Sequence, residues 1–146
     1  MKTLFFVIAI LVVGFSANAQ NTRTLVNNYT VVKDALTAGD SKGAAQAIAV
    51  FQKNVSAEGN FDQKATLLKS ADELAKAGTI DKQRVVFNDL SVALWDVIKH
   101  AEKLDVTTYY QYCPMKKAYW VSLTKEIKNP YYGAAMLSCG KTVETK

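Results

Sequence analysis

Four sulfur-containing residues near the C-terminus carry the strongest chemical signal in this sequence. Cys113 and Met115 stand two residues apart, and Met136 precedes Cys139 by three residues. These are both of the 2 cysteines and two of the 3 methionines, and the remaining methionine is the first residue. Thiolates and thioethers are the soft ligands that select monovalent copper. The clustering therefore predicts a two-thiolate, two-thioether site for copper(I) or for a similar soft ion such as silver.

Local geometry favours such a site in both halves. Pro114 favours a turn or an extended chain, from which Cys113 and Met115 could approach one ion. The spacing of the second pair would put both sulfur atoms on one face of a helical turn. His100, the only histidine, is an auxiliary candidate ligand, although a position near the end of a helix also favours a histidine for electrostatic reasons.

A disulfide is the alternative explanation for the cysteines. An even number of cysteines in an oxidising compartment predicts a bridge between Cys113 and Cys139. Closing that loop would stabilise the fold by roughly 3 to 4 kcal/mol in the chain-entropy model. The methionines would then serve as packing residues, because methionine fills irregular gaps well.

The N-terminus has the pattern of a secretory signal peptide. Lys2 precedes the apolar run Leu4–Val13, and Ala17 and Ala19 form the small-x-small pattern that a signal peptidase reads. We expect residues 1–19 to be removed by cleavage after Ala19. The apolar run is too short to span a bilayer, so we expect a soluble periplasmic protein with no membrane insertion after cleavage.

Residues 20–146 are predicted to form one domain whose residues 20–104 are an up-and-down four-helix bundle. Apolar residues at helical spacing predict the helices, roughly over residues 22–38, 44–55, 61–75 and 80–103. Gly39, Gly59 and Gly78 each close an apolar stripe. A capping residue follows each glycine, namely Asp40, Asn60 and Thr79. Linkers this short favour antiparallel neighbours, which predicts an all-α fold.

Residues 105–146 differ in character from the helical part. The segment from Val106 to Tyr112 is rich in β-branched and aromatic residues, which favours an extended chain over a helix. The Asn129-Pro130 turn signal follows later. We interpret the whole segment as a largely irregular aromatic tail that folds against the bundle. The packing residues around the sulfur site are predicted to be Trp95, Tyr119, Trp120, Tyr131 and Tyr132.

Four short motifs in this tail resemble the signature of domain-of-unknown-function family 3347. They are Tyr-Cys-Pro-Met at 112–115, Ala-Tyr-Trp-Val-Ser at 118–122, Ile-Lys-Asn-Pro-Tyr-Tyr-Gly at 127–133 and Met-Leu-Ser-Cys-Gly at 136–140. The resemblance implies an exported bacterial protein. Similar domains are appended to membrane fusion proteins of copper and silver efflux systems, which implies copper-efflux or other periplasmic metal-handling proteins as partners.

Other classes of function fit the sequence poorly. The formal net charge is +5, but the lysines are spread over polar faces and form no dense basic stripe, which argues against nucleic-acid binding. No nucleophile elbow, phosphate loop or histidine-rich zinc motif occurs, so we expect no enzyme activity. The two hypotheses are therefore a soft-metal binding or relay protein and a disulfide-stapled, non-enzymatic protein-interaction module.

Overall fold

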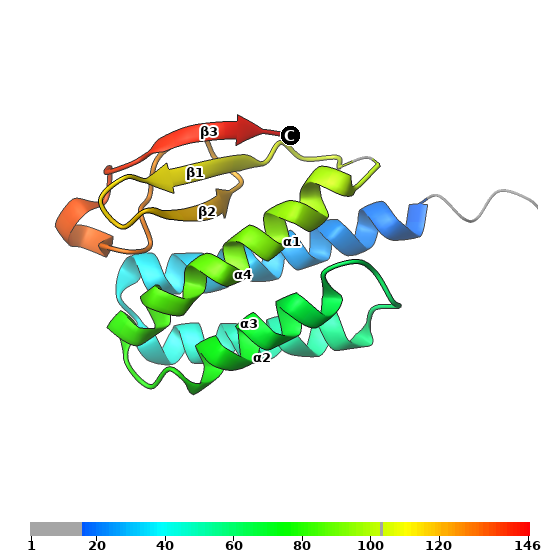
Figure 1. The fold of residues 1–146 in the computed structure, drawn as a ribbon, viewed down its shortest axis with the longest axis horizontal. Coiled ribbons are helices and arrows are strands. Elements are labelled where there is room, and N and C mark those ends of the chain that lie inside the picture. Colours follow the sequence, from blue (N-terminus) through cyan, green and yellow to red (C-terminus); the bar gives the residue numbers. More distant parts are fainter. Residues whose placement is uncertain (1–15, 103) are drawn as a thin grey trace, which may run out of the picture.

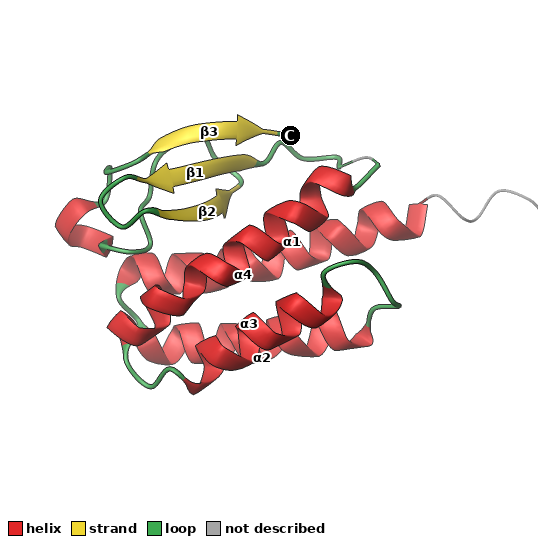
Figure 2. Cartoon of the chain, in the orientation of Figure 1, coloured by secondary structure: helices red, strands yellow, loops and turns green. Residues whose placement is uncertain are grey.

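The computed structural model describes residues 16–102 and 104–146, with side chains from residue 22 onward. Four helices are followed by a small sheet (Figures 1 and 2). The elements are, in chain order, α1 (Ser16–Ala38), α2 (Ser41–Ala57), α3 (Lys64–Lys76), α4 (Ile80–His100), β1 (Tyr109–Cys113), β2 (Ala118–Ser122), the 3₁₀ helix η1 (Gly133–Met136) and β3 (Lys141–Thr145).

The predicted apolar stripes form the core of the helical part. Buried side chains on the stripe of α1 include Leu25, Tyr29, Val32 and Leu36. On α2 the stripe is equally well buried, at Ala44, Ile48, Phe51 and Val55. Consecutive helices contact each other, and α1 also contacts α4. Each helix can therefore bury its apolar face against its neighbours.

Two of the three predicted caps are confirmed. The Asp40 carboxylate accepts a hydrogen bond of 2.8 Å from the backbone N–H of Gly43 at the start of α2. Thr79 caps α4 through the N–H of Lys82, at 3.4 Å. The prediction for Asn60 is wrong, because α3 begins later and the residue before it is Gln63, with a left-handed backbone.

The all-α prediction is wrong, because residues of the C-terminal segment form a three-stranded antiparallel sheet. The strand order is β2-β1-β3. β1 lies within and just after the segment predicted to be extended, but it pairs on both sides instead of remaining irregular. Both neighbours satisfy its backbone hydrogen-bonding groups, which an irregular buried tail could not do as completely.

The sheet packs on α4 and α1, while α2 and α3 lie on the far side of these two helices (Figure 1). Trp95 of α4 stacks on Tyr110 of β1, with ring centroids 4.7 Å apart and planes 2° from parallel. Tyr110 in turn stacks on Tyr119 of β2 at 4.8 Å. This aromatic row fastens the hairpin of β1 and β2 to the bundle.

Side chains cover the outer edge of β2. The backbone N–H of Tyr119 donates to the Asn88 side-chain oxygen at 2.9 Å, and its carbonyl accepts from the Tyr131 hydroxyl. The N–H of Val121 donates to the Tyr29 hydroxyl at 3.1 Å. These bonds occupy backbone groups that an open edge would offer to another strand.

The predicted signal sequence falls largely outside the described residues. Its apolar run Leu4–Val13 belongs to residues 1–15, whereas Ala17 and Ala19 are in the first turns of α1. Within the described part of the chain, no helix has both the length and the apolar character needed to cross a membrane.

Candidate metal centre

The hairpin of β1 and β2 fixes the position of Cys113. Cys113 is the last residue of β1 and lies opposite Ala118, the first residue of β2. Its side chain is fully buried. Pro114 begins the turn that joins the strands, and Lys117 ends that turn with a left-handed φ of 51°. The first cysteine therefore stands on a rigid element and not on a loose tail.

Asn129 organises the loop that carries the second cysteine. Its side chain is fully buried, and its amide donates to the carbonyl of Cys139 at 2.7 Å. Its side-chain oxygen accepts from the N–H of Tyr131 at 2.8 Å. Its backbone N–H donates to Leu137 and its carbonyl accepts from Gly133, at 2.8 and 3.1 Å. One residue thus closes the loop on both sides of η1.

Gly140 brings this loop close to the hairpin. A Cβ atom at Gly140 would lie 2.7 Å from the Trp120 ring and 3.0 Å from the carbonyl oxygen of Tyr112. The φ of Gly140 is +147°, which also favours glycine. Because Tyr112 pairs with Lys141, the chain just before β3 runs beside the end of β1. Cys139, the residue before Gly140, therefore lies beside Cys113 at the end of β1.

The Cys139 thiol lies near enough to the Cys113 thiol for the two groups to affect each other's protonation, and both cysteines are free. The pKa of the Cys139 thiol is raised by desolvation, and further by the charge of Cys113 and by a hydrogen bond with Cys113. Each of these effects favours the protonated thiol over the thiolate. The two ends of the C-terminal segment therefore meet, as both the metal and the disulfide hypotheses require.

The methionines have different surroundings. Met115 projects from the hairpin turn and is 61% exposed. Met136 is half-buried at the end of η1, and its carbonyl accepts a hydrogen bond of 3.1 Å from the N–H of Cys139. Met136 and Cys139 therefore belong to one hydrogen-bonded turn, close to the spacing that the sequence suggested.

His100 is not brought to the cysteines. It ends α4 with an exposed ring whose Nδ1 lies 2.8 Å from the carbonyl oxygen of Asp96. The side-chain oxygen of Asn88 in α4 accepts a hydrogen bond from the backbone N–H of Tyr119, and Cys113 pairs with the residue just before Tyr119. The twelve residues from Asn88 to His100 correspond to about 18 Å of helix. The helix dipole accounts for a histidine at this position.

The donor set limits which metals fit. No group of three or more His, Cys, Asp and Glu side chains that could hold a metal occurs among the described residues. Structural zinc sites need four ligands, mostly thiolate and imidazole. Two thiols with methionines in the same two segments instead match the preference of copper(I) and silver for soft ligands.

The predicted packing residues differ in burial. Trp95, Trp120 and Tyr131 are buried, whereas Tyr119 and Tyr132 are half-buried. Tyr110, the direct partner of Trp95, was missed, although its position in the aromatic run was a usable signal. Asn129 was also missed as a site residue, because the turn signal with Pro130 gave no hint of its buried contact with Cys139.

Comparison with known proteins identifies the family. Residues 25–106 match the family described as "Protein of unknown function (DUF3347)". The match begins within α1, continues through α4 and ends before β1, so the motifs at 112–140 lie outside it. No curated protein and no solved structure matches the chain. Because the match extends over more than half of the sequence, the chain belongs to the DUF3347 family.

Proposed function

We propose that this protein binds copper(I), or a similar soft ion such as silver, as cargo between the thiolates of Cys113 and Cys139. The proposal is carried by the nearness of the two thiols, which follows from the close approach of Gly140 to Tyr112 and the pairing of Tyr112 with Lys141. Copper(I) accepts two thiolates in a linear arrangement, so this pair is sufficient for binding. Zinc would need further ligands that this pair does not supply.

The surroundings of the pair support a prepared site. Cys113 is held by strand pairing, and Cys139 by the buried amide of Asn129. Ligands held in advance do not have to be ordered when the metal binds, which lowers the cost of binding. Met136 shares a turn with Cys139, and Met115 extends from the neighbouring turn. The thioethers of the two methionines would act as weaker soft ligands of the bound ion, or would bind the ion first as it enters the site.

Protons compete with the metal at this site. Metal binding needs the thiolate form, and the raised pKa of Cys139 favours the thiol. Binding should therefore release protons and become tighter as the pH rises. A site of this kind gives up its ion more readily at lower pH, which suits a relay better than permanent storage.

The setting of the proposal is the periplasm. The N-terminal pattern favours export, and the resemblance to domains of copper and silver efflux systems favours copper-handling proteins as partners. The protein would act by binding and transfer, without catalysis, nucleic acid or insertion into a membrane. N-terminal sequencing of exported protein would test cleavage after Ala19.

Competition with a copper(I) chelator under anaerobic, reducing conditions tests the proposal. Replacing groups that only hydrogen-bond to the ligands of a metal typically costs 10- to 100-fold in affinity. Removing one of two thiolates, in Cys139→Ser, should therefore weaken copper(I) binding by at least about a hundredfold. Ser138→Ala changes the neighbouring exposed residue and should leave the affinity unchanged. Equal affinity in wild type and Cys139→Ser would contradict the proposal.

The same nearness of the two thiols favours a second candidate, a disulfide-stapled interaction module. In an oxidising compartment, a bridge would fix the loop between the cysteines to the sheet. Titration of thiols in protein purified without reductant distinguishes the two candidates. Two free thiols that disappear on copper loading support metal binding, whereas their absence before loading supports the staple.

A further inference from the structure

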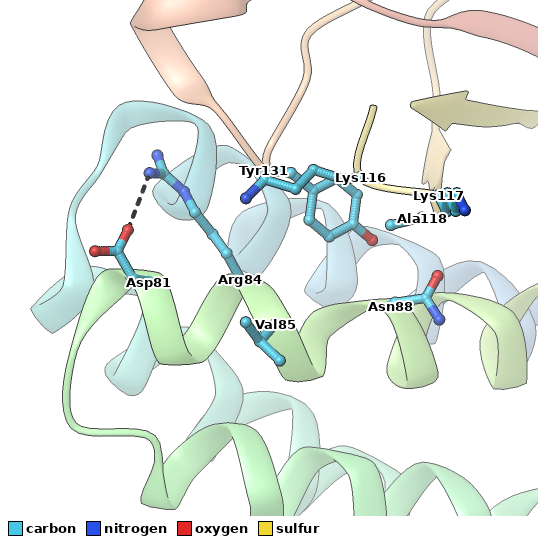
Figure 3. A pocket seen from close by; sticks show the side chains of 8 residues that line it. All are labelled: Asp81, Arg84, Val85, Asn88, Lys116, Lys117, Ala118 and Tyr131. Atoms are coloured by element: carbon cyan, nitrogen blue, oxygen red, sulfur yellow. Dashed lines mark ion pairs between the residues drawn. The ribbon is translucent and has the colours of Figure 1, made fainter. Parts of the chain in front are cut away.

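A basic groove lies between the first half of α4 and the hairpin turn (Figure 3). Its volume is about 340 Å³. Neither the thiol pair nor the methionines line it. The lining residues are Asp81, Arg84, Val85, Asn88, Lys116, Lys117, Ala118 and Tyr131.

Arg84 is fixed in this groove by backbone carbonyl groups. Its Nε donates to the carbonyl of Pro130 and its Nη2 to that of Leu36, both at 2.8 Å. Its Nη1 faces Asp81 at 4.0 Å, and the Asp81 side chain is 92% exposed. A long, exposed ion pair contributes little, so this side of the guanidinium can accept another anion.

Two lysines add positive charge from the hairpin turn. Figure 3 shows Lys116 extending across Tyr131 toward Arg84, while Lys117 lies at the other end of the groove beside Ala118. The ammonium group of Lys116 is also 4.9 Å from the centre of the Tyr132 ring. Three cations and one carboxylate therefore line the groove. Such a concave, one-sided charge distribution concentrates anions.

One wall of the groove is apolar. Val85 is 77% exposed, more than any other large hydrophobic side chain that the structure describes. Tyr131 and Ala118, whose side chains are otherwise buried, line the groove together with Val85. Ligand sites commonly combine apolar walls with a few converging polar groups. A ligand with an anionic group and an apolar body would use both features.

We infer that this groove binds a carboxylate ligand, with the negative charge between Arg84 and Lys116 and apolar atoms against Val85. Arginine pairs well with carboxylates, and the two lysines add attraction that depends on ionic strength. The carboxylate belongs to a small molecule, because the groove's volume of about 340 Å³ lies in the range of small-molecule sites. This inference goes beyond the proposed metal site, and it does not depend on copper binding.

Titrations of the metal-free protein, followed by NMR of backbone amides, test the inference. The two probes are hexanoate and a capped peptide of alternating glutamate and leucine, with a lysine-leucine peptide as the control. Saturable shifts of Val85, Asn88 and Lys117 with hexanoate support the inference. Binding of the acidic peptide without binding of hexanoate would indicate a protein segment as the occupant and would overturn the inference.

Matched variants show whether the groove is responsible. Lys116→Gln with Lys117→Gln should weaken binding about fivefold or more, since each exposed pair contributes modestly. Lys42→Gln with Lys53→Gln removes the same charge from exposed positions of α2 and should change binding by less than about twofold.

A repulsive variant provides a second comparison. Val85→Glu places a negative charge in the groove, whereas Val92→Glu places it at an exposed position elsewhere on α4. Only the first should weaken binding strongly. The inference is overturned if hexanoate does not saturate the protein up to about 10 mM. It is also overturned if the lysine pair in the groove matters no more than the pair on α2.

Discussion

The Asn129 side chain donates a hydrogen bond of 2.7 Å to the carbonyl of Cys139 and so holds the second cysteine against the first. Asn129 is fully buried, and both ends of its amide are used. The cysteine pair is therefore a product of loop geometry as much as of the sheet.

Asn129→Asp should damage the fold more than its small size change suggests. The aspartate cannot donate to Cys139 when ionised, and it would place an anion beside a carbonyl in a buried position. We expect the free energy of unfolding to fall by about 1 to 3 kcal/mol or more, measured by chemical denaturation. Asn60→Asp makes the same change at an exposed position, and its effect should stay within about 0.5 kcal/mol. Similar effects at both positions would refute the role of Asn129.

Met115→Leu with Met136→Leu separates a four-sulfur site from a two-thiol site. Both thiols remain, and leucine is similar in size to methionine, so the melting temperature of the metal-free protein should change little. If the thioethers bind copper(I), the affinity in chelator competition should drop by about tenfold or more. Unchanged affinity would show that the cysteines bind alone, with Met115 and Met136 outside the site.

The reactivity of Cys139 should report the raised pKa. We expect its alkylation rate to reach half of its maximum at a pH above the ordinary cysteine pKa of about 8.5. Cys113→Ala removes the neighbouring charge and the hydrogen bond, so the midpoint should move toward the ordinary value. A midpoint that does not move would contradict the nearness of the two thiols.

The raised pKa of the Cys139 thiol also makes the free energy of unfolding depend on pH. A raised pKa in the folded state means that the unfolded thiol loses its proton first as the pH rises. The contribution of Cys139 is fully present below the pKa of the unfolded thiol and is lost as the pH rises through the folded value. Denaturation of reduced protein should therefore become easier at alkaline pH, and Cys139→Ser should reduce that dependence.

Tyr29→Phe tests the protection of the β2 edge. The Tyr29 hydroxyl accepts from the N–H of Val121 and lies 2.6 Å from the Ser91 hydroxyl, which donates to the carbonyl of Phe87. Removing the Tyr29 hydroxyl leaves the buried N–H of Val121 without an acceptor, which should lower the free energy of unfolding by about 1 to 3 kcal/mol. Tyr109→Phe, at a half-exposed position of β1, should cost less than about 0.5 kcal/mol. Equal costs would argue against the edge contact.

The sequence by itself determined the helical half of this protein. Residues such as Leu25, Val32 and Phe51 repeat at helical spacing because each helix turns one face to the core, and they are buried. Asp40 and Thr79 mark helix starts because their side chains bond to nearby backbone groups. These signals are local, so they could be read without a structure.

Only the tertiary structure decided the sheet and the meeting of the cysteines. The residues of β2 do not alternate in polarity, because the strand is largely buried on both faces. β3 is short and mostly exposed, and it pairs with β1 across some thirty residues of chain. His100 falls far from Cys113 because β1 runs back along α4 before its last residue is reached. Asn129 and Cys139 are close in sequence, but only the folded loop turns the side-chain amide of Asn129 toward the carbonyl of Cys139. The same loop brings the Cys139 thiol toward that of Cys113.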